Sequence, residues 1–189
     1  MKIILGSRSI FRRAILSKAG YDFEVMSADV DEKSIRSDNF QLLPLLIAKA
    51  KAETLLNKIH SPSILITADQ VAVCDGALRE KPVNKNQARE YLESYGQHPV
   101  ETITAVVVTN TQTKQQAAEI DIAIVHFKPI KSAVINQLIS QGNIFHAAGG
   151  FIIEDPLLKP FIDHVDGTVE SVSGLPMQLT NQLINQVRE

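Results

Sequence analysis

Ile64-Leu65-Ile66-Thr67-Ala68-Asp69-Gln70-Val71-Ala72-Val73-Cys74-Asp75-Gly76 is an apolar stretch that one acid interrupts and an Asp-Gly pair ends. The unbroken apolar run at its start predicts a strand that is buried on both faces. Asp75-Gly76 predicts a two-residue hairpin turn, after which residues 77–82 return as a second strand. An ionised carboxylate inside such a strand is costly unless a cation or hydrogen-bond donors meet it. Asp69 therefore requires a partner.

The return strand brings Lys81 toward this acid. If Cys74 pairs with Ala77 across the turn, Lys81 lies opposite Gln70, one position from Asp69. Strict alternation places Lys81 and Asp69 on opposite faces of the sheet, although a bulge or the long lysine stem would let both serve one cleft. Two interpretations of Asp69 stay open on these residues: a structural acid neutralised by a nearby lysine, or a catalytic carboxylate.

Composition narrows the class of protein. The chain has 189 residues, 44% of them hydrophobic, and a formal net charge of −2, which predicts a globular protein and argues against a strongly basic nucleic-acid binder. We expect neither a signal peptide nor a membrane span. The single cysteine, Cys74, excludes an internal disulfide and indicates a reducing cytoplasm. The five histidines are scattered without a His-x-x-x-His pair, so we expect no zinc site.

The N-terminal segment carries basic residues at an unusual place. Lys2 to Leu5 predicts a strand, and Ser9 after Gly6-Ser7-Arg8 predicts the N-cap of a helix that runs to about Ala19. Arg12 and Arg13 fall in the first turn, where positive charge opposes the helix dipole. An anion held by the free N–H groups and the guanidinium groups explains them better than ordinary solvation does. The segment lacks the Gly-Lys-Ser/Thr ending of a Walker loop.

The rest of the chain contains a group of acidic residues, two lysines in a predicted helix, and turn residues that separate the expected helices and strands. Asp29-Val30-Asp31-Glu32 supplies three carboxylates, which suit either a hard cation such as magnesium or a solvated loop. Lys49 and Lys51 lie in a predicted helix over residues 42–59. The other expected elements are a strand at 21–27, a helix at 84–95 ended by Gly96, strands at 98–109 and 117–127 forming an antiparallel pair, a helix at 131–140 ended by Gly142, a glycine turn at 147–154, and a last helix opened by Gly174-Leu175-Pro176.

These charged residues describe one kind of chemistry if the fold brings them together. The helix start with Arg12 and Arg13, together with Lys51 and Lys81, supplies positive charge for a polyphosphate. Asp69 and the acidic loop supply carboxylates for a divalent ion and an activated water. Such a set suits phosphoryl-type hydrolysis, in which the protein contributes positioning and charge compensation rather than a covalent intermediate.

The whole chain resembles the Maf family of nucleoside triphosphate pyrophosphatases. Each matching piece is weak alone, but their order and spacing over nearly the full length make the resemblance specific. The pieces are Leu5-Gly6-Ser7-Arg8-Ser9-Ile10-Phe11-Arg12-Arg13, Val30-Asp31-Glu32, Ile47-Ala48-Lys49-Ala50-Lys51-Ala52, Ala68-Asp69-Gln70-Val71, Asp75-Gly76, Glu80-Lys81-Pro82, Thr104-Ala105-Val106, Ala148-Gly149-Gly150 and Gly174-Leu175-Pro176. Ile10 in place of a proline and Glu80 in place of a glycine depart from the family pattern.

The resemblance implies an α/β fold in a single domain over residues 1–189: an elongated, curved mixed sheet flanked by helices, with a cleft between two lobes. It also implies a cytoplasmic house-cleaning hydrolase of nucleotide metabolism, which cleaves a nucleoside triphosphate to the monophosphate and pyrophosphate with Mg²⁺ or Mn²⁺, and it makes a homodimer plausible. No nucleic-acid or membrane partner is expected. The roles that it implies are water activation by Asp69, metal binding by Glu32 and Asp69, and phosphate binding by Ser7, Arg12, Arg13, Lys51 and Lys81.

Base choice in the family follows three positions, which here are Phe11, Gln70 and Glu154. This combination resembles the branch that acts on 7-methyl-GTP, because an aromatic ring stacks on a cationic purine and a carboxylate accepts from guanine N–H groups. The alternatives are the same chemistry on dTTP, UTP or CTP, core packing for Phe11 with a surface role for Glu154, and a regulator of septum formation that binds nucleotide without turnover.

Overall fold

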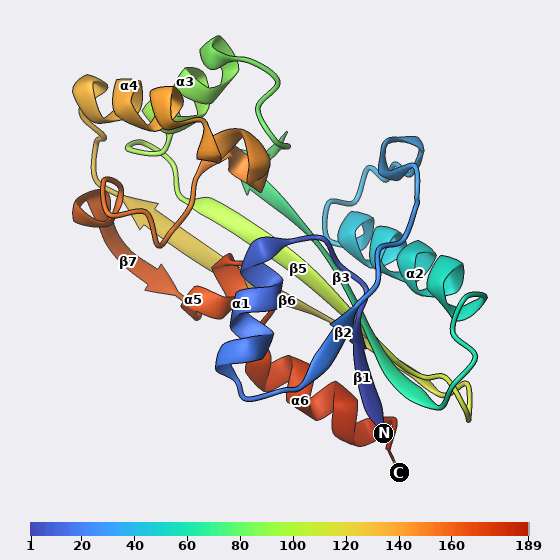
Figure 1. Ribbon diagram of the computed structural model, residues 1–189. Coiled ribbons are helices and arrows are strands. Elements are labelled where there is room, and N and C mark those ends of the chain that lie inside the picture. Colours follow the sequence, from blue (N-terminus) through green and yellow to red (C-terminus); the bar gives the residue numbers. More distant parts are fainter. Residues whose placement is uncertain (189) are drawn as a thin grey trace. The chain divides into compact units, whose positions relative to one another are not determined.

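The protein has a mixed α/β fold built on a seven-stranded sheet, seen in a computed structural model that describes residues 1–188 (Figure 1). The strands are β1 (Lys2–Leu5), β2 (Phe23–Val25), β3 (Ser63–Cys74), β4 (Ala77–Arg79), β5 (Val100–Asn110), β6 (Gln116–Phe127) and β7 (Ile162–Asp166). The helices are α1 (Ile10–Lys18), α2 (Leu42–Leu56), α3 (Lys85–Ser94), α4 (Ser132–Gln141), α5 (Val169–Val172) and α6 (Met177–Gln186), with short 3₁₀ turns η1 (Glu32–Ser34), η2 (Asn143–His146), η3 (Ala148–Gly150) and η4 (Lys159–Phe161).

The sheet mixes parallel and antiparallel neighbours, as expected for the fold class. Its order is β2-β1-β3-β5-β6-β7, with β4 paired to β3. Strand β1 runs parallel to both β2 and β3, whereas β4 is antiparallel to β3 and β7 is antiparallel to β6. Strands β5 and β6 are neighbours joined by a short turn, a connection that permits only antiparallel pairing.

The chain divides into two compact units, and the first contains residues 1–70, 104–121 and the segment from Gly174 onward. Here helices cover both faces of the strands. Leu16 of α1 and Leu183 and Ile184 of α6 pack with Ile64 and Ile66 of β3 in one core cluster. On the opposite face, α2 supplies Ala48, Ala52 and Leu55 to a second cluster. Figure 1 shows α2 on one side of these strands and α1 and α6 on the other.

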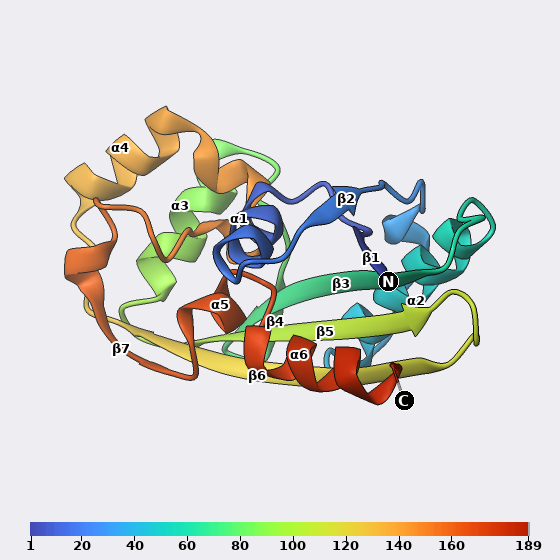
Figure 2. The ribbon, with the colours of Figure 1, turned by 60° about the horizontal axis from the view of Figure 1, so that its bottom comes forward.

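The second unit contains residues 71–103 and 122–173. Its core combines Leu92 and Tyr95 from the α3 segment with Ile135 and Leu138 of α4, and the two helices pack side by side (Figure 2). The Tyr95 ring stacks on Phe127 with centroids 5.6 Å apart, and Phe151 meets both rings edge-on. Because Tyr95 is fully buried, its hydroxyl requires a partner, and it donates to the carbonyl of Gly149.

Several local predictions are confirmed. Ser9 caps α1 by accepting from the Arg12 amide, and Asn84 caps α3 by accepting from the Gln87 amide. Cys74 pairs with Ala77, and both turn residues between them have positive φ, 51° at Asp75 and 68° at Gly76, as the two-residue hairpin requires. Gly142 ends α4 in the left-handed conformation, with a φ of 80°.

One local prediction is wrong, one holds for another reason, and one strand was not predicted. The return strand ends at Arg79 rather than at residue 82, so the pairing does not extend to Lys81. Helix α3 ends at Ser94, two residues before Gly96, as predicted. Gly96 does not have a positive φ; it is required because a Cβ there would lie 2.7 Å from Cα of Pro129. Strand β7 was not expected, because residues 162–166 are mostly polar, as an outermost strand allows.

Within residues 1–188, no helix combines the length and the apolar character that crossing a membrane requires.

Candidate functional site

Asp69 lies on strand β3 where side chains alternate between the two covered faces of the first unit. Ile64, Ile66 and Ala68 belong to the core beneath α1 and α6, so the intervening residues point to the face that α2 covers. Thr67 follows this pattern and donates from its hydroxyl to the carbonyl oxygen of Ala48 in α2 at 2.8 Å. Asp69 is two residues further along the same face and is only 8% exposed.

Lys51 of α2 is the partner that this buried acid requires. Its Nζ lies 2.7 Å from Oδ1 of Asp69 and 2.8 Å from Oε1 of Glu32. The Lys51 and Asp69 side chains are 11% and 12% exposed, whereas Glu32, in the short turn η1, is 47% exposed. One ammonium thus joins a buried carboxylate to a carboxylate at the surface. The predicted lysine partner of Asp69, Lys81, is not the one that this structure provides.

Arg12 is buried beside this acid and ties three segments together. Its Nε donates to the carbonyl of Gly174 at 2.8 Å, and its Nη1 donates to the carbonyl of Ala68 at 2.9 Å and to Oγ of Ser7 at 3.3 Å. Ser7 Oγ also accepts from the Ser9 amide. The guanidinium therefore fixes the loop after β1, the strand next to Asp69 and the turn before α6 at one point.

The pKa values of Asp69 and Arg12 are shifted by their burial and by the charges around them. Burial raises the pKa of Asp69 above its ordinary value of 3.8, although the charges of Lys51 and Arg12 oppose that rise. Burial lowers the pKa of Arg12, while the nearby carboxylates of Asp69 and Glu32 act against the change. A carboxylate with a raised pKa is a stronger base once ionised, and it is held here beside fixed positive charge.

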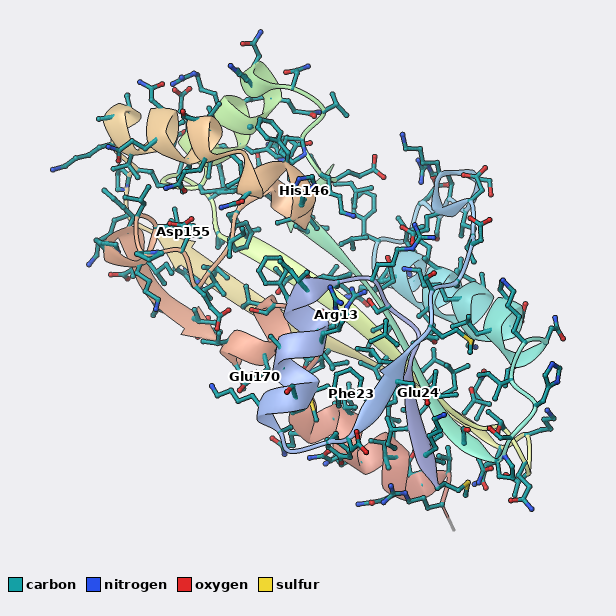
Figure 3. The ribbon with its side chains drawn as sticks, viewed as in Figure 1. Arg13, Phe23, Glu24, His146, Asp155 and Glu170 are labelled. Carbon is teal, nitrogen blue, oxygen red and sulfur yellow. The ribbon has the colours of Figure 1, made fainter. Side chains whose placement is uncertain are left out.

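The other predicted residues of the first unit lie around this cluster. Arg13 is exposed on the first turn of α1 (Figure 3), and Phe11 is half-buried on the same turn. Gln70 is half-buried and donates from Nε2 to the hydroxyl of Thr104 on β5 at 2.8 Å. In the sequence Thr104 stands only in the motif Thr104-Ala105-Val106. Its hydrogen bond to the Gln70 amide depends on the pairing of β3 with β5.

Lys81 and Glu154 belong to the second unit, and both are exposed. Lys81 precedes Pro82, which packs against the glycine turn: a Cβ on Gly150 would lie 2.6 Å from Cγ of Pro82. Gly150 has a φ of 64°, so this turn requires glycine both for its conformation and for its space. Two of the sequence motifs thus pack against each other within this unit.

Gly174 is a part of the site whose role the sequence did not reveal. Its carbonyl accepts from Arg12, its φ is 92°, and a Cβ there would lie 3.3 Å from both Nε of Arg12 and Oε1 of Gln70. A glycine just before a proline at a helix start was visible in the sequence, but only the fold shows that it leaves room for two side chains of the site.

Gly174→Ala is expected to destabilise the protein more than Gly20→Ala does. Both glycines have left-handed φ values, 92° and 81°, but a Cβ on Gly20 meets nothing within 4 Å. The backbone strain, about 1–2 kcal/mol, is common to both variants, and only Gly174→Ala also crowds Arg12 and Gln70. Urea denaturation measures the difference. Equal losses of unfolding free energy in the two variants would show that Gly174 is not needed for packing in the site.

Known proteins resemble this chain over nearly its whole length. A family model described as Maf-like protein matches residues 2–187. The chain is 44% identical to a 7-methyl-GTP pyrophosphatase of Dictyostelium discoideum, covering 99% of this chain and 98% of that protein. It is 32% identical to a 7-methyl-GTP pyrophosphatase of Idiomarina loihiensis, over 93% and 89% of the two chains. It is 29% identical to a dTTP/UTP pyrophosphatase of Vibrio vulnificus, over 98% of each.

Proposed function

The chain belongs to the Maf family, and from that premise we propose that it is a nucleoside triphosphate pyrophosphatase that releases a nucleoside monophosphate and pyrophosphate. The named relatives are pyrophosphatases acting on nucleotides, and the alternative of a regulator of septum formation without turnover is not favoured. The single observation that carries the proposal is the environment of the buried Asp69 carboxylate. Its Oδ1 lies 2.7 Å from Nζ of Lys51, and the positive charge of Arg12 also acts on it.

Asp69 is the group that we propose to accept the proton of the attacking water. Its raised pKa makes it a more effective base than an ordinary aspartate, and general-base catalysis contributes about 10²–10⁴-fold to a rate. Lys51 keeps the ionised form in place through a charge-assisted hydrogen bond. Attack at the α-phosphorus breaks the bond to the bridging oxygen, and pyrophosphate departs with that oxygen.

Positive side chains are proposed to hold the phosphates. Arg12 uses Nε and Nη1 on protein acceptors, so its contribution is the shape of the Ser7 loop and a fixed charge. Arg13 is exposed on the same helix turn and is therefore accessible to an anion. The phosphate-binding roles of Ser7, Lys51 and Lys81 rest on the family resemblance, and for Lys81 on that resemblance alone.

The two carboxylates of the cluster fit a divalent metal. Oxygens of Asp69 and Glu32 both lie within 2.8 Å of the Lys51 ammonium, so the two carboxylates are close together, and each has a second oxygen outside this ion pair. Mg²⁺ is commonly bound by one or two carboxylates together with substrate phosphates. We propose that Glu32 and Asp69 hold Mg²⁺ or Mn²⁺, which when bound neutralises charge on the phosphates.

The preferred base is proposed to be 7-methylguanine. The relative with 44% identity is named a 7-methyl-GTP pyrophosphatase, and Phe11 is a half-buried ring on the helix turn that also carries Arg13. An aromatic face attracts a cationic purine. Gln70 is oriented by Thr104, and Glu154 is an exposed carboxylate in the turn after the two glycines. dTTP, UTP and CTP remain the alternative substrates.

Pyrophosphate release from a panel of nucleotides tests the function. With Mg²⁺ present, we expect turnover of 7-methyl-GTP with a higher kcat/KM than that of GTP, dTTP, UTP or CTP. Faster turnover of dTTP and UTP would overturn the base assignment and leave the chemistry in place. Binding of a triphosphate with no turnover of any member would overturn the enzymatic proposal itself.

The organisation and location of the enzyme are proposed on the same premise. The family match is continuous over residues 2–187, and each compact unit is assembled from segments that alternate along the chain. We therefore propose that the chain works as one Maf-like domain. A cytoplasmic location is supported by a single buried, unpaired cysteine, and a homodimer is proposed from the resemblance.

A further inference from the structure

Two histidines meet across the outermost strand pair of the second unit. His126 on β6 is paired directly with His164 on β7, and Asp166 lies two residues further along β7, diagonal to His126. Side chains placed in this way share one face of the pair. The two imidazole rings are stacked with centroids 4.0 Å apart and planes inclined by 11°. Nε2 of His126 lies 3.2 Å from Oδ2 of Asp166.

A β-bulge adds a fourth side chain to this group. The register passes from His126 opposite His164 to Phe127 opposite Ile162, so Asp163 is an extra residue without a partner on β6. A bulge changes the direction of its side chain, and Oδ2 of Asp163 lies 3.0 Å from Nδ1 of His164. Its other oxygen, Oδ1, is 3.5 Å from the ammonium of Lys128.

The Asp163 contact decides which nitrogen of His164 is available. A proton on Nδ1 is donated to the carboxylate, which leaves Nε2 of His164 with a free lone pair. Histidines that bind metals almost always donate their other ring N–H to a carboxylate, carbonyl or water. His164 with Asp163 already has that arrangement.

The set is chemically a site for an ion softer than magnesium. Within residues 1–188, His126, His164 and Asp166 form the one group of three or more His, Cys, Asp or Glu side chains with ligand atoms all within 4.8 Å of one another. Two imidazoles and a carboxylate suit zinc and its neighbours rather than Mg²⁺. Two ligands about 2.0 Å from a tetrahedral ion lie about 3.3 Å apart, close to the 3.2 Å between His126 and Asp166.

We propose that His126, His164 and Asp166 form a binding site for a divalent transition metal ion of the zinc type, with Asp163 orienting His164 as a ligand. The three ligand side chains are 33%, 54% and 62% exposed, so an ion reaches them from solvent and a water completes the tetrahedral coordination. None of the four residues has a role in the proposed hydrolysis, so a test of this site is independent of a test of that function.

The three ligands do not form a recognisable sequence motif, because they lie on two paired strands rather than on one helix. The expectation of no zinc site rested on the absence of a His-x-x-x-His pair, which is a helical spacing. The pairing of β6 with β7 brings together His126 and His164, which are 38 positions apart in the sequence. Strand β7, which carries two of the three ligands, was not predicted.

Titration with Co²⁺ and Zn²⁺ tests the proposal on the full-length protein. With excess Mg²⁺ present to occupy the proposed site at Glu32 and Asp69, we expect one Co²⁺ per chain with visible absorption bands. This Co²⁺ should be displaced by Zn²⁺ but not by the Mg²⁺. His126→Ala and His164→Ala should abolish these bands. Asp163→Asn should weaken Zn²⁺ binding by about 10–100-fold, the usual effect of losing a group that orients a metal ligand. All of these side chains are at least partly exposed, and circular dichroism checks that the variants are folded.

Two controls separate this site from other metal binding. His98 lies 3.7 Å from Asp75 on the surface of the same unit and offers a single His–Asp pair, so His98→Ala should leave the Co²⁺ bands unchanged. Asp69→Asn should also leave them unchanged. Absence of the bands in the wild-type protein, their survival in His126→Ala and His164→Ala, or their equal loss in His98→Ala would each overturn the proposal.

Discussion

Asp69→Asn is expected to lower kcat/KM for pyrophosphate release by about 10²–10⁴-fold, the contribution of a positioned general base. Asparagine preserves the size of the side chain and a hydrogen-bond acceptor for Lys51, but it does not accept a proton. Lys51 keeps its second carboxylate partner, Glu32, at 2.8 Å, so the buried ammonium is still compensated. Triphosphate binding, measured by calorimetry with Mg²⁺, should therefore persist.

The dependence of kcat/KM on pH provides a second measurement of the same role. A base must be ionised to act, so activity is lost as the pH falls through the pKa of Asp69. Burial raises that pKa above 3.8, which places the acid limb of the profile at a higher pH than an ordinary aspartate would give. In Asp69→Asn this limb should disappear from the residual activity.

The exposed Asp22, in the same unit, supplies the matched control. Asp22→Asn makes the same chemical change and should leave both the rate and the acid limb unchanged. Wild-type rates in Asp69→Asn, or an acid limb that survives there, would remove Asp69 from its proposed role.

Arg12→Met is expected to lower the free energy of unfolding by about 2–5 kcal/mol, because it leaves two buried carbonyl oxygens without their donor. These are the oxygens of Ala68 and Gly174, which now accept from the guanidinium at 2.9 Å and 2.8 Å. Arg12 also lowers the pKa of Asp69. Its removal should therefore shift the acid limb of kcat/KM further upward in any variant that still folds.

Arg13→Met is the matched control, one residue away in the sequence. Arg13 is exposed on α1, so its removal should change the unfolding free energy by no more than about 0.5 kcal/mol. If Arg13 contacts the phosphates as proposed, its loss should weaken triphosphate binding instead. Arg12→Lys keeps the charge but cannot donate to three acceptors in the fork geometry of a guanidinium, and it should remain destabilised in urea. Equal stability of the Arg12 and Arg13 variants would contradict this account.

The contrast between Arg12 and Arg13 shows that helical spacing in the sequence could have separated the buried arginine from the exposed one. Both were assigned to one anion site because both stand in the first helix turn. Helical spacing separates them, since Arg12 shares the buried face of α1 with Leu16 four residues later. The same signal distinguishes Lys51, which lies between buried Ala48 and Leu55, from the exposed Lys49.

Local structure was predictable wherever one or two residues determine the conformation. The caps at Ser9 and Asn84 and the hairpin after Cys74 are of this kind. The partner of Asp69 was not predictable, because Lys51 is 18 positions away and meets it only when α2 lies over β3. The sequence alone left Asp69 open between a structural and a catalytic acid. The Lys51 ion pair is compatible with both interpretations, so the catalytic role stays a proposal that Asp69→Asn tests.

The outermost strands of the sheet, β2, β4 and β7, also bear on aggregation. Strands β2 (Phe23–Val25) and β4 (Ala77–Arg79) are each only three residues long, and β7 carries acidic and imidazole side chains together with the Asp163 bulge. A short strand and an irregular, charged one present few regularly spaced amide and carbonyl groups to another molecule. Folded copies are thus poor templates for intermolecular β-pairing, and the protein should resist fibril growth from its native state at high concentration.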